Sequence, residues 1–451
     1  GEGRGALRRT GGGLVHGPAD GASRAELQLH IGAQAPIGCG IWPVPLLPMK
    51  SPAFPPAAPR CACSMPCSTP PILRAMERAD DRALALAIAQ EALRWMADLD
   101  ALIDGATRQP LPEDAKARSV LRLMLAQALR LNLPGHAIVA TGLPLLVGGP
   151  RRLAHGVFSA VTKGGAKLPE APTLPPAVAA RWHVAWPERL GTIAQGLAEP
   201  PPLDLTLRDP AQTAHWAERL GGQSLAPGHI RLARAGAIEA LDGFSEGAWW
   251  VQDLAASVPA RLLGEGKGRR ALDLCAAPGG KTLQLAAAEW DVTALDKSAR
   301  RTERLAENLK RSGLTAQVVV ADALNWQPEH PFDAILLDAP CSATGTCRRH
   351  PDVLHRHANL AELTALQSAM LDRAATWLAP GGTLVYAVCS LEREEGELQA
   401  LAFDKLPPAP VTEVELPEGL TPIDGHFRSD PGMLAEQGGI DGFFAARWVK
   451  G

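Results

Sequence analysis

The residues of this chain most able to do chemistry are two cysteines and the residues of one glycine turn. The turn lies in DLCAAPGGKT (residues 273–282), where a short apolar strand passes through Gly279 and Gly280 into a helix. Cys341 in DAPCSATG and Cys389 in LVYAVCSLEREE each follow a later apolar strand. Glycines let a backbone approach a ligand closely, and the N–H groups at a helix N-terminus face that ligand. The pattern predicts covalent cysteine chemistry beside a nucleotide-type cofactor.

Two common phosphate-binding motifs do not match this glycine turn. A P-loop needs a glycine five places before the second glycine of Gly-Lys-Thr. That place is Cys275 here, and Pro278 is among the residues between. The G-x-G-x-x-G pattern of dinucleotide-binding proteins is also missing from the sequence. The turn therefore argues against an NTPase and against a dinucleotide-dependent enzyme.

Aspartates follow two further predicted strands. Asp296 ends the second strand, where an acidic side chain can accept both ribose hydroxyls of an adenosine. Asp322 ends the third strand, in VVVADA, where it is placed to meet an adenine edge. A single aspartate is more often a turn former or a helix cap, but repetition at successive strand ends favours a ligand site. Without a pyrophosphate-binding motif, the pattern favours a single-nucleoside cofactor such as S-adenosylmethionine.

The two cysteines can be interpreted in two ways. Lone cysteines are usually small buried hydrophobic residues. Cys341 and Cys389, however, both stand just past the carboxyl ends of predicted core strands, where a ligand site must lie. A thiolate is well suited to attack an electron-poor ring carbon. Methylation of a pyrimidine at carbon 5 needs such an attack, because that carbon is not nucleophilic until a thiolate adds at carbon 6.

The elements that position these residues alternate from residue 270 onward. The sequence predicts buried strands at 271–275, 292–295, 316–321, 333–339 and 382–388, and helices at 281–288, 298–312 and 359–378. Pro380, Gly381 and Gly382 are expected to end the last helix. This alternation predicts a doubly wound, mostly parallel α/β domain with its ligands at the carboxyl ends of the strands.

The front part of the chain has helical periodicity and indicates an all-α domain. Apolar residues recur at spacings of three and four: Leu84, Ile88, Ala92, Trp95, Leu99 and Leu102, then Val120, Leu121, Met124, Leu125, Ala128 and Leu129. A proline-rich linker at 200–202 leads into a mixed stretch at 203–263. We expect an all-α domain at 73–200, a small α+β subdomain at 201–268 and the α/β domain at 269–451.

Residues 1–72 are expected to be a disordered leader. They are rich in glycine and then in proline, with eleven prolines between Pro36 and Pro71, and such a composition buries too little apolar surface to offset chain entropy. Cys61, Cys63 and Cys67 leave metal binding as an alternative, but no histidine follows them at zinc-finger spacing. A working protein that begins near residue 76 is a further hypothesis.

The formal charge of −3 hides a gradient along the chain. Residues 74–189 hold 15 Lys and Arg against 11 Asp and Glu, whereas residues 271–451 hold 16 against 25. A chain whose helical part is basic and whose catalytic part is acidic is suited to contact RNA through the helical part. No apolar run approaches the roughly 20 residues that span a bilayer, and the eight cysteines lack the spacing of a secreted disulfide scaffold. We expect a cytoplasmic monomer that binds no metal and no membrane.

Several motifs carry a family resemblance. DLCAAPGGKT, DAPCSATG, RRHPD (residues 348–352), LAPGGTLVYAVCSLEREE with its preceding helix, and the terminal DGFFAARWVK resemble the RNA 5-methylcytosine methyltransferases. The helical part and VQDLAAS (residues 251–257) resemble the RsmB (Fmu/Sun) group, which has a NusB-like domain and methylates small-subunit ribosomal RNA. The resemblance spans residues 83–450. His155 in RRLAHGVFSAV stands where that group usually has asparagine, which bears on RNA contacts and not on the fold.

The resemblance implies a Rossmann-like class I methyltransferase and a role for each site residue. Cys389 would be the nucleophile, and Cys341 would assist release of the methylated base. S-adenosylmethionine would lie with its methionine end in the loop formed by Cys275, Ala276, Ala277, Pro278, Gly279, Gly280 and Lys281, its ribose at Asp296 and its adenine at Asp322. Asp338 would meet either the cofactor or the cytosine edge. Lys163, Lys167, Arg348 and Arg349 are predicted phosphate contacts, with a solvated charged face as the alternative for each.

Two other functions fit parts of the sequence. The same fold and cysteine pair serve transfer RNA methylation; the NusB-like part favours small-subunit ribosomal RNA, outside the assembled subunit, by analogy. The second alternative is a non-catalytic RNA-binding adaptor with a relic methyltransferase domain. Both cysteines and all three strand-end aspartates are present, which argues against a relic.

Overall fold

The computed structural model describes residues 79–233 and 236–451. The expected leader at 1–72, the three cysteines within it at 61, 63 and 67, and the hypothesised start near residue 76 all lie outside the described residues. No helix in the described part of the chain is long and apolar enough to cross a membrane.

Five helices form the first packed unit of the described chain. They are α2 (Ala79–Arg94), α3 (Met96–Gly105), α4 (Lys116–Leu129), α5 (Gly135–Gly142) and α6 (Gly148–Lys163). Their core includes Trp95, Leu99, Leu121 and Met124, so the predicted apolar spacing marks the buried face. Leu84 belongs to the same spacing but is exposed, because the packed cluster begins at Ala92. The predicted all-α region is therefore present.

Two helices and a small sheet follow. Helix α7 (Pro176–Ala185) and helix α8 (Leu190–Gly196) precede a three-stranded sheet of order β2-β1-β3. Its strands are β1 (Leu203–Leu207), β2 (His229–Leu232) and β3 (Trp249–Val251), and β1 is antiparallel to both neighbours. Helix α9 (Thr213–Leu220) covers this sheet through Trp216.

The large sheet has seven strands in the order β6-β5-β4-β7-β8-β10-β9. The strands are β4 (Arg270–Leu274), β5 (Asp291–Asp296), β6 (Gln317–Val320), β7 (Phe332–Asp338), β8 (Leu378–Val388), β9 (Phe427–Ser429) and β10 (Phe443–Val449). The first five are parallel, and β10 pairs antiparallel with β8 and with β9. The chain winds from β4 toward β6 and then crosses back to β7, so the topological switch lies between β4 and β7. This is the predicted doubly wound, mostly parallel fold.

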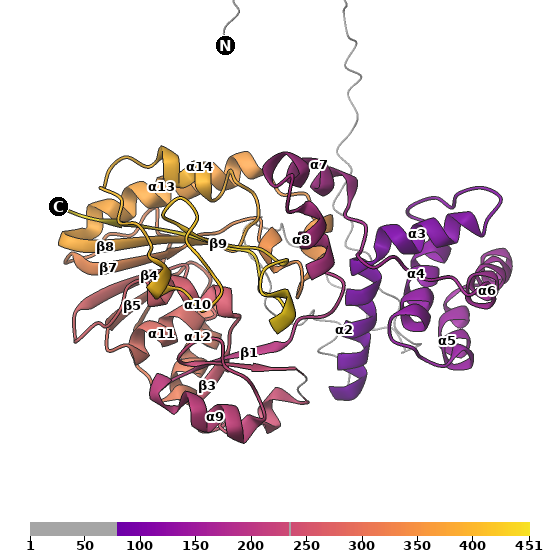
Figure 1. Cartoon of the computed structure of the whole chain (residues 1–451), viewed down its shortest axis with the longest axis horizontal. Coiled ribbons are helices and arrows are strands. Elements are labelled where there is room, and N and C mark those ends of the chain that lie inside the picture. The colour runs from indigo at the N-terminus through magenta and orange to yellow at the C-terminus, as the bar shows by residue number, and fades with distance from the viewer. Residues whose placement is uncertain (1–78, 234–235) are drawn as a thin grey trace, which may run out of the picture. The chain divides into compact units, whose positions relative to one another are not determined.

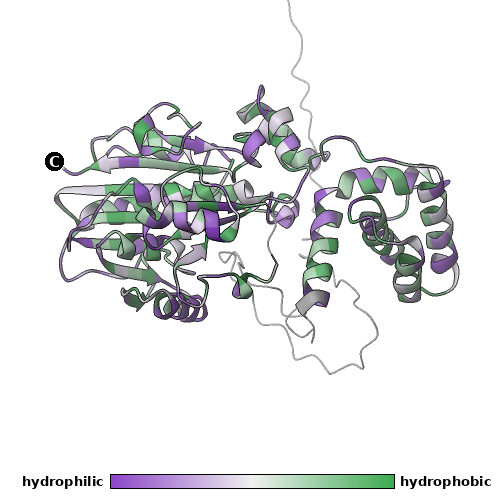
Figure 2. Cartoon of the chain, turned by 60° about the horizontal axis from the view of Figure 1, so that its bottom comes forward, coloured by the Kyte–Doolittle hydropathy of each residue, from purple (hydrophilic) through white to green (hydrophobic). Residues whose placement is uncertain are grey.

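Helices cover both faces of the large sheet (Figure 1). Helices α10 (Leu254–Arg261), α11 (Gly280–Ala287) and α12 (Ala299–Ser312) pack on one face, and α13 (Leu360–Trp377) and α14 (Glu397–Ala402) pack on the other. Figure 2 shows hydrophobic segments on the central strands, while hydrophobic and hydrophilic segments alternate along the helices. A sheet buried on both faces explains why its strands are continuous apolar runs in the sequence.

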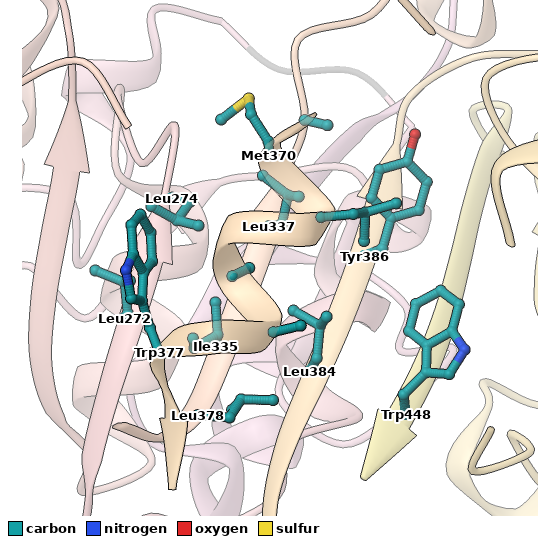
Figure 3. Close-up of a cluster of buried hydrophobic side chains, with 14 of the residues drawn as sticks. Leu272, Leu274, Ile335, Leu337, Met370, Trp377, Leu378, Leu384, Tyr386 and Trp448 are labelled. Atoms are coloured by element: carbon teal, nitrogen blue, oxygen red, sulfur yellow. The ribbon is translucent and has the colours of Figure 1, made fainter. Parts of the chain in front are cut away.

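The face under α13 holds a cluster of large side chains (Figure 3). Met370 and Trp377 from the helix pack over Leu337, Leu384 and their neighbours on β4, β7 and β8. This core fixes the strand ends at which the candidate site lies.

The end of α13 differs from the prediction. The helix ends at Trp377, and residues 380–382 lie inside β8 instead of between the helix and the strand. The pairing of β8 with β7 shifts register at this point, and Gly381 has a φ of 75°. Gly381 also donates its N–H to the Lys450 carbonyl at 2.8 Å. The glycine therefore allows an irregularity within a strand and does not terminate the helix.

Candidate active site

The glycine loop, residues 275–281, joins β4 to α11 at the carboxyl edge of the sheet. Cys275 and Gly279 have positive φ angles of 63° and 107°. The angle at residue 279 is one that residues with a side chain rarely adopt, so this turn requires glycine. Helix α11 begins at Gly280, and its first N–H groups, which have no partner within the helix, lie at this edge.

Asp296 lies at the end of β5 and is buried. Its Oδ2 accepts the N–H of Ala277 at 3.2 Å and lies 3.4 Å from Nη1 of Arg301. Its Oδ1 accepts the N–H of Ser298 at 2.9 Å. The carboxylate that the sequence assigned to a ribose thus also holds the glycine loop against β5.

Asp322 and Asp338 lie at the same edge of the sheet. Asp322 is exposed, two residues beyond the end of β6, and its Oδ1 accepts the N–H of Leu324 at 2.9 Å. Asp338 ends β7, and its Oδ2 accepts a hydrogen bond from Nζ of Lys281 at 2.8 Å. Burial opposes the charge of Lys281, but Asp338 outweighs it, and the pKa of Lys281 is raised. The side chain of Asp338 keeps 30% of its surface exposed, so it can meet a ligand while paired.

Cys341 and Cys389 come together although 48 residues separate them in the sequence. Cys389 directly follows β8, and Cys341 lies three residues beyond β7, the neighbouring strand. Their Sγ atoms are 3.5 Å apart, within hydrogen-bond distance for sulfur. The hydrogen bond to Cys389, with burial, raises the pKa of Cys341 well above that of a free thiol. Cys341 therefore keeps its proton at neutral pH and can donate it toward Cys389.

Gly345 ties the loop after Cys341 to the segment around Cys389. Its N–H donates to the carbonyl of Cys389 at 3.0 Å, and its own carbonyl accepts the N–H of Gly442 at 2.8 Å. A Cβ atom at position 345 would lie 1.9 Å from the Gly442 oxygen, so only glycine allows this approach.

Asp273 is a site residue that the sequence reasoning did not single out. It lies on β4 below the glycine loop, is fully buried, and its Oδ2 accepts the hydroxyl of Thr282 at 2.5 Å. Its Oδ1 is buried without a hydrogen-bond partner. Burial raises the pKa of Asp273 to about 7. The sequence around Asp273 does not indicate a raised pKa, because the residue lies within an apolar strand and belongs to no recognisable charged pattern.

We expect Asp273→Asn to stabilise the protein more at pH 8 than at pH 5. The native carboxyl keeps its proton up to about pH 7, whereas the unfolded carboxyl loses it near pH 3.8. Its contribution to the free energy of unfolding is therefore complete below that lower pKa and is lost as pH rises through 7, because the unfolded state binds fewer protons. Asparagine can still accept from Thr282 and carries no such dependence.

Thermal melting of both proteins at pH 5 and pH 8 measures the effect. Asp291→Asn, at the exposed opposite end of the neighbouring strand β5, is the control. A difference in melting temperature between Asp273→Asn and wild type that is the same at both pH values would contradict the prediction.

Arg348 and Arg349 correct one expectation from the sequence. Arg348 is only 2% exposed, and its guanidinium lies 3.8 Å from Asp441. Arg349 bonds to Asp253 at 2.5 Å and to Asp441 at 3.0 Å. Both side chains form ion pairs within the protein and are therefore not free to contact RNA phosphates. Lys163, in the last turn of α6, and Lys167 are exposed, as the RNA-contact hypothesis requires.

Helices of the front part contact the segments that carry the cysteines. From α2, Arg94 donates to the carbonyl of Arg348 at 2.8 Å, and Gln90 donates to that of Arg349 at 2.9 Å. From α7, Trp182 donates to Oε1 of Glu392 at 3.1 Å, and Arg181 pairs with the same carboxylate. Glu392 lies three residues after Cys389. The front helices therefore support the segments that follow both cysteines.

The residues at this edge fit a cationic nucleoside cofactor. Asp296, Asp322 and Asp338 lie at this edge, and Lys281 and Arg301 form ion pairs with Asp338 and Asp296. A site with excess carboxylates suits a ligand that carries a sulfonium and an ammonium group. The glycine loop leaves backbone N–H groups for its carboxylate.

A doubly wound sheet with this loop and strand-end carboxylates defines a Rossmann-like class I methyltransferase. A family model described as "16S rRNA methyltransferase RsmB/F" matches residues 260–449. Ribosomal RNA small subunit methyltransferase B of Klebsiella pneumoniae is 35% identical over 82% of this chain and 90% of its own length. The protein of the same name from Citrobacter koseri is 36% identical, and the match covers 82% of this chain and 91% of that protein. The chain therefore belongs to the RsmB/F family of 16S ribosomal RNA methyltransferases.

A solved structure agrees with this fold. The methyltransferase homolog protein from Pyrococcus horikoshii matches with a TM-score of 0.52 and 26% identity. The match covers 65% of this chain and 98% of that one.

Proposed function

We propose that this chain methylates carbon 5 of a cytosine in small-subunit ribosomal RNA, through a covalent cysteine adduct and with S-adenosylmethionine as methyl donor. The observation that carries the proposal is the 3.5 Å separation of the Cys341 and Cys389 sulfurs, at the ends of adjacent strands beside the glycine loop. Two thiols at this distance, at the ligand edge of a methyltransferase fold, suit a reaction that needs one sulfur to attack and another group to move a proton.

In the proposed reaction Cys389, as thiolate, attacks carbon 6 of cytosine. The π electrons of the carbon 5–carbon 6 double bond then form a new bond from carbon 5 to the incoming methyl group. When bound, the cofactor would supply that methyl group, and the electrons of the broken sulfur–methyl bond would remain on its sulfur. Solvent water takes the carbon 5 proton, the electrons of that C–H bond return to the ring as the carbon 5–carbon 6 double bond, and the bond from carbon 6 to Cys389 breaks. Cys341, whose raised pKa keeps it protonated, gives a proton to the departing thiolate.

The remaining site residues bind and orient. In the proposal, residues 275–281 surround the methionine end of the cofactor, Asp296 binds the ribose and Asp322 the adenine edge. Asp338, which is paired with Lys281, would meet either the cofactor or the cytosine edge. The cytosine must be unstacked to enter, at a cost of a few kcal/mol. Lys163 at the end of α6 and Lys167 in the loop after it would contact RNA phosphates.

Bisulfite sequencing of ribosomal and transfer RNA from a strain that lacks the gene tests the substrate. We expect one small-subunit ribosomal cytosine to lose its methyl group, and the purified chain to restore it on naked ribosomal RNA better than on assembled subunits. Loss of methylation in transfer RNA alone would favour the second candidate substrate. No change in either RNA, with RNA binding retained, would favour an adaptor.

The cofactor proposal predicts a specific loss in Asp296→Ala. Wild type should bind S-adenosylmethionine in the micromolar range, about −8 kcal/mol. The variant should bind it more weakly by roughly 1.5–3 kcal/mol, because it loses hydrogen bonds to a charged group and the support of the glycine loop.

Isothermal titration of S-adenosylmethionine into wild type, Asp296→Ala and Asp291→Ala measures this. Asp291 lies at the exposed, opposite end of the same strand, so its replacement should leave affinity unchanged. Equal loss in both variants, or tight binding of NAD or ATP in place of S-adenosylmethionine, would contradict the cofactor assignment.

A further inference from the structure

Glu395 is a fully buried carboxylate six residues after Cys389. It lies in LEREE, where Glu392, Glu394 and Glu395 look alike in sequence. In the structure they have different surroundings: Glu392 pairs with Arg181, and Glu394 is exposed. Glu395 alone faces the loops that carry the two cysteines.

The carboxylate of Glu395 accepts four hydrogen bonds from neutral donors. Oε1 accepts the N–H of Ser342 at 2.8 Å and Nε2 of Gln367 at 3.0 Å. Oε2 accepts the hydroxyl of Ser342 at 2.5 Å and that of Ser390 at 2.6 Å. All four lone-pair directions of the carboxylate are therefore used.

The partners of Glu395 are placed on both sides of the reacting pair. Ser342 directly follows Cys341, and Ser390 directly follows Cys389. Gln367 of α13 also donates to the carbonyl of Pro340 at 2.9 Å, so the residues on both sides of Cys341 are held. The hydroxyl of Tyr386 on β8 donates to the backbone carbonyl of Glu395 at 2.6 Å, which holds the backbone of Glu395 to the sheet.

We propose that Glu395 is a positioning residue that sets the distance and orientation of the Cys341 and Cys389 sulfurs by tying the residue after each cysteine to one carboxylate. This inference rests on the proposed function, since it assigns a purpose to that cysteine pair. Glu395 itself touches neither sulfur. Its effect on turnover comes from geometry, and a misplacement of about 1 Å at a reacting group costs up to roughly 10²-fold in rate.

Glu395→Gln in the full-length chain tests the proposal. Glutamine has the same shape but one acceptor oxygen, and its amide presents donors where two hydroxyls now donate. We expect kcat to fall about 10- to 100-fold, while the KM for RNA and the affinity for S-adenosylmethionine stay within about twofold. Glu394→Gln, one residue away and exposed, is the matched control and should match wild type.

Amide hydrogen exchange gives a readout that does not depend on activity. The peptide that contains Ser342 and the peptide that contains Ser390 should exchange faster in Glu395→Gln, while peptides from β7 and β4 stay protected. If Glu395→Gln is poorly folded, Ser342→Ala removes one hydroxyl donor and keeps the carboxylate. It should then show a smaller fall in kcat with the same KM pattern.

Unchanged kcat in Glu395→Gln despite faster exchange would overturn the positioning role, and so would unchanged exchange in both peptides. A general rise in exchange, with KM and cofactor affinity lost alongside kcat, would mark Glu395 as a fold-stabilising residue only and also overturn it. Failure of the proposed function is distinguishable, because wild type and Glu394→Gln would then methylate no cytosine.

Discussion

Cys389→Ala should have no detectable methyltransferase activity, and Cys341→Ala should accumulate a covalent protein–RNA adduct. The sulfurs lie 3.5 Å apart, so either can reach the same base, but only one can attack first. Without Cys389 no bond to carbon 6 forms, and methylation stops while cofactor binding stays near normal. Without Cys341 the attack proceeds, but the departing thiolate lacks its proton donor and release is slow.

Denaturing electrophoresis of each variant after incubation with substrate RNA and S-adenosylmethionine measures the adduct. The double variant should form none. Cys347→Ala is the control, because Cys347 is buried in a separate hydrophobic cluster nearby and should affect neither step. An adduct in Cys389→Ala in place of Cys341→Ala would reverse the two roles and keep the reaction. Full activity in both variants would exclude the cysteine mechanism.

A fragment that begins at residue 203 should be far less stable than one that begins at residue 171. The sequence placed the domain boundary near residue 200, and such a boundary would make residues 203–451 an independently folding part of the chain. In the structure α7 and α8 share a hydrophobic cluster with Leu354 and Leu391 of the catalytic part. Trp182 at its centre is completely buried, and Arg189 of the same segment pairs with Asp430.

Removal of α7 and α8 exposes that cluster. Full burial of each large apolar side chain contributes about 1.5–3 kcal/mol, and the cluster takes Leu174, Val178, Trp182, Ile193 and Leu197 from the deleted segment. The expected loss of several kcal/mol is a large fraction of the roughly 5–15 kcal/mol that keeps a domain folded. The shorter fragment should also lose activity on short RNA, because Glu392, next to the Cys389 segment, loses Arg181 and Trp182.

Urea unfolding of the two fragments, with methyl transfer to a short cytosine-containing RNA, checks this prediction. The fragment from residue 171 should bind S-adenosylmethionine as the full chain does and methylate long RNA less well, because it lacks Lys163 and Lys167. If the fragment from 203 is equally stable and equally active on short RNA, α7 and α8 do not support the catalytic part.

The sequence by itself determined the fold class and the edge of the sheet at which the site lies. Continuous apolar runs, glycine turns and helical spacing are local properties, so they placed β4 to β8 and their helices to within a few residues. The positions of Cys275, Asp296, Cys341 and Cys389 at strand ends followed from the same pattern. Because parallel strands present their carboxyl ends at one edge, the strand ends alone were enough to bring these residues together.

Only the tertiary structure decided which charged residues are free and which are internal. Arg348 and Arg349 look like exposed basic residues in sequence, but Asp441, 92 residues beyond Arg349, lies beside both. Glu394 and Glu395 are adjacent and alike, yet one is exposed and the other bonds to the residues after both cysteines. The partner of a buried charged residue comes from a distant part of the chain, so the local sequence does not predict that the residue is paired. For the same physical reason, the docking of α7 on the Cys389 segment became visible only once the chain was folded.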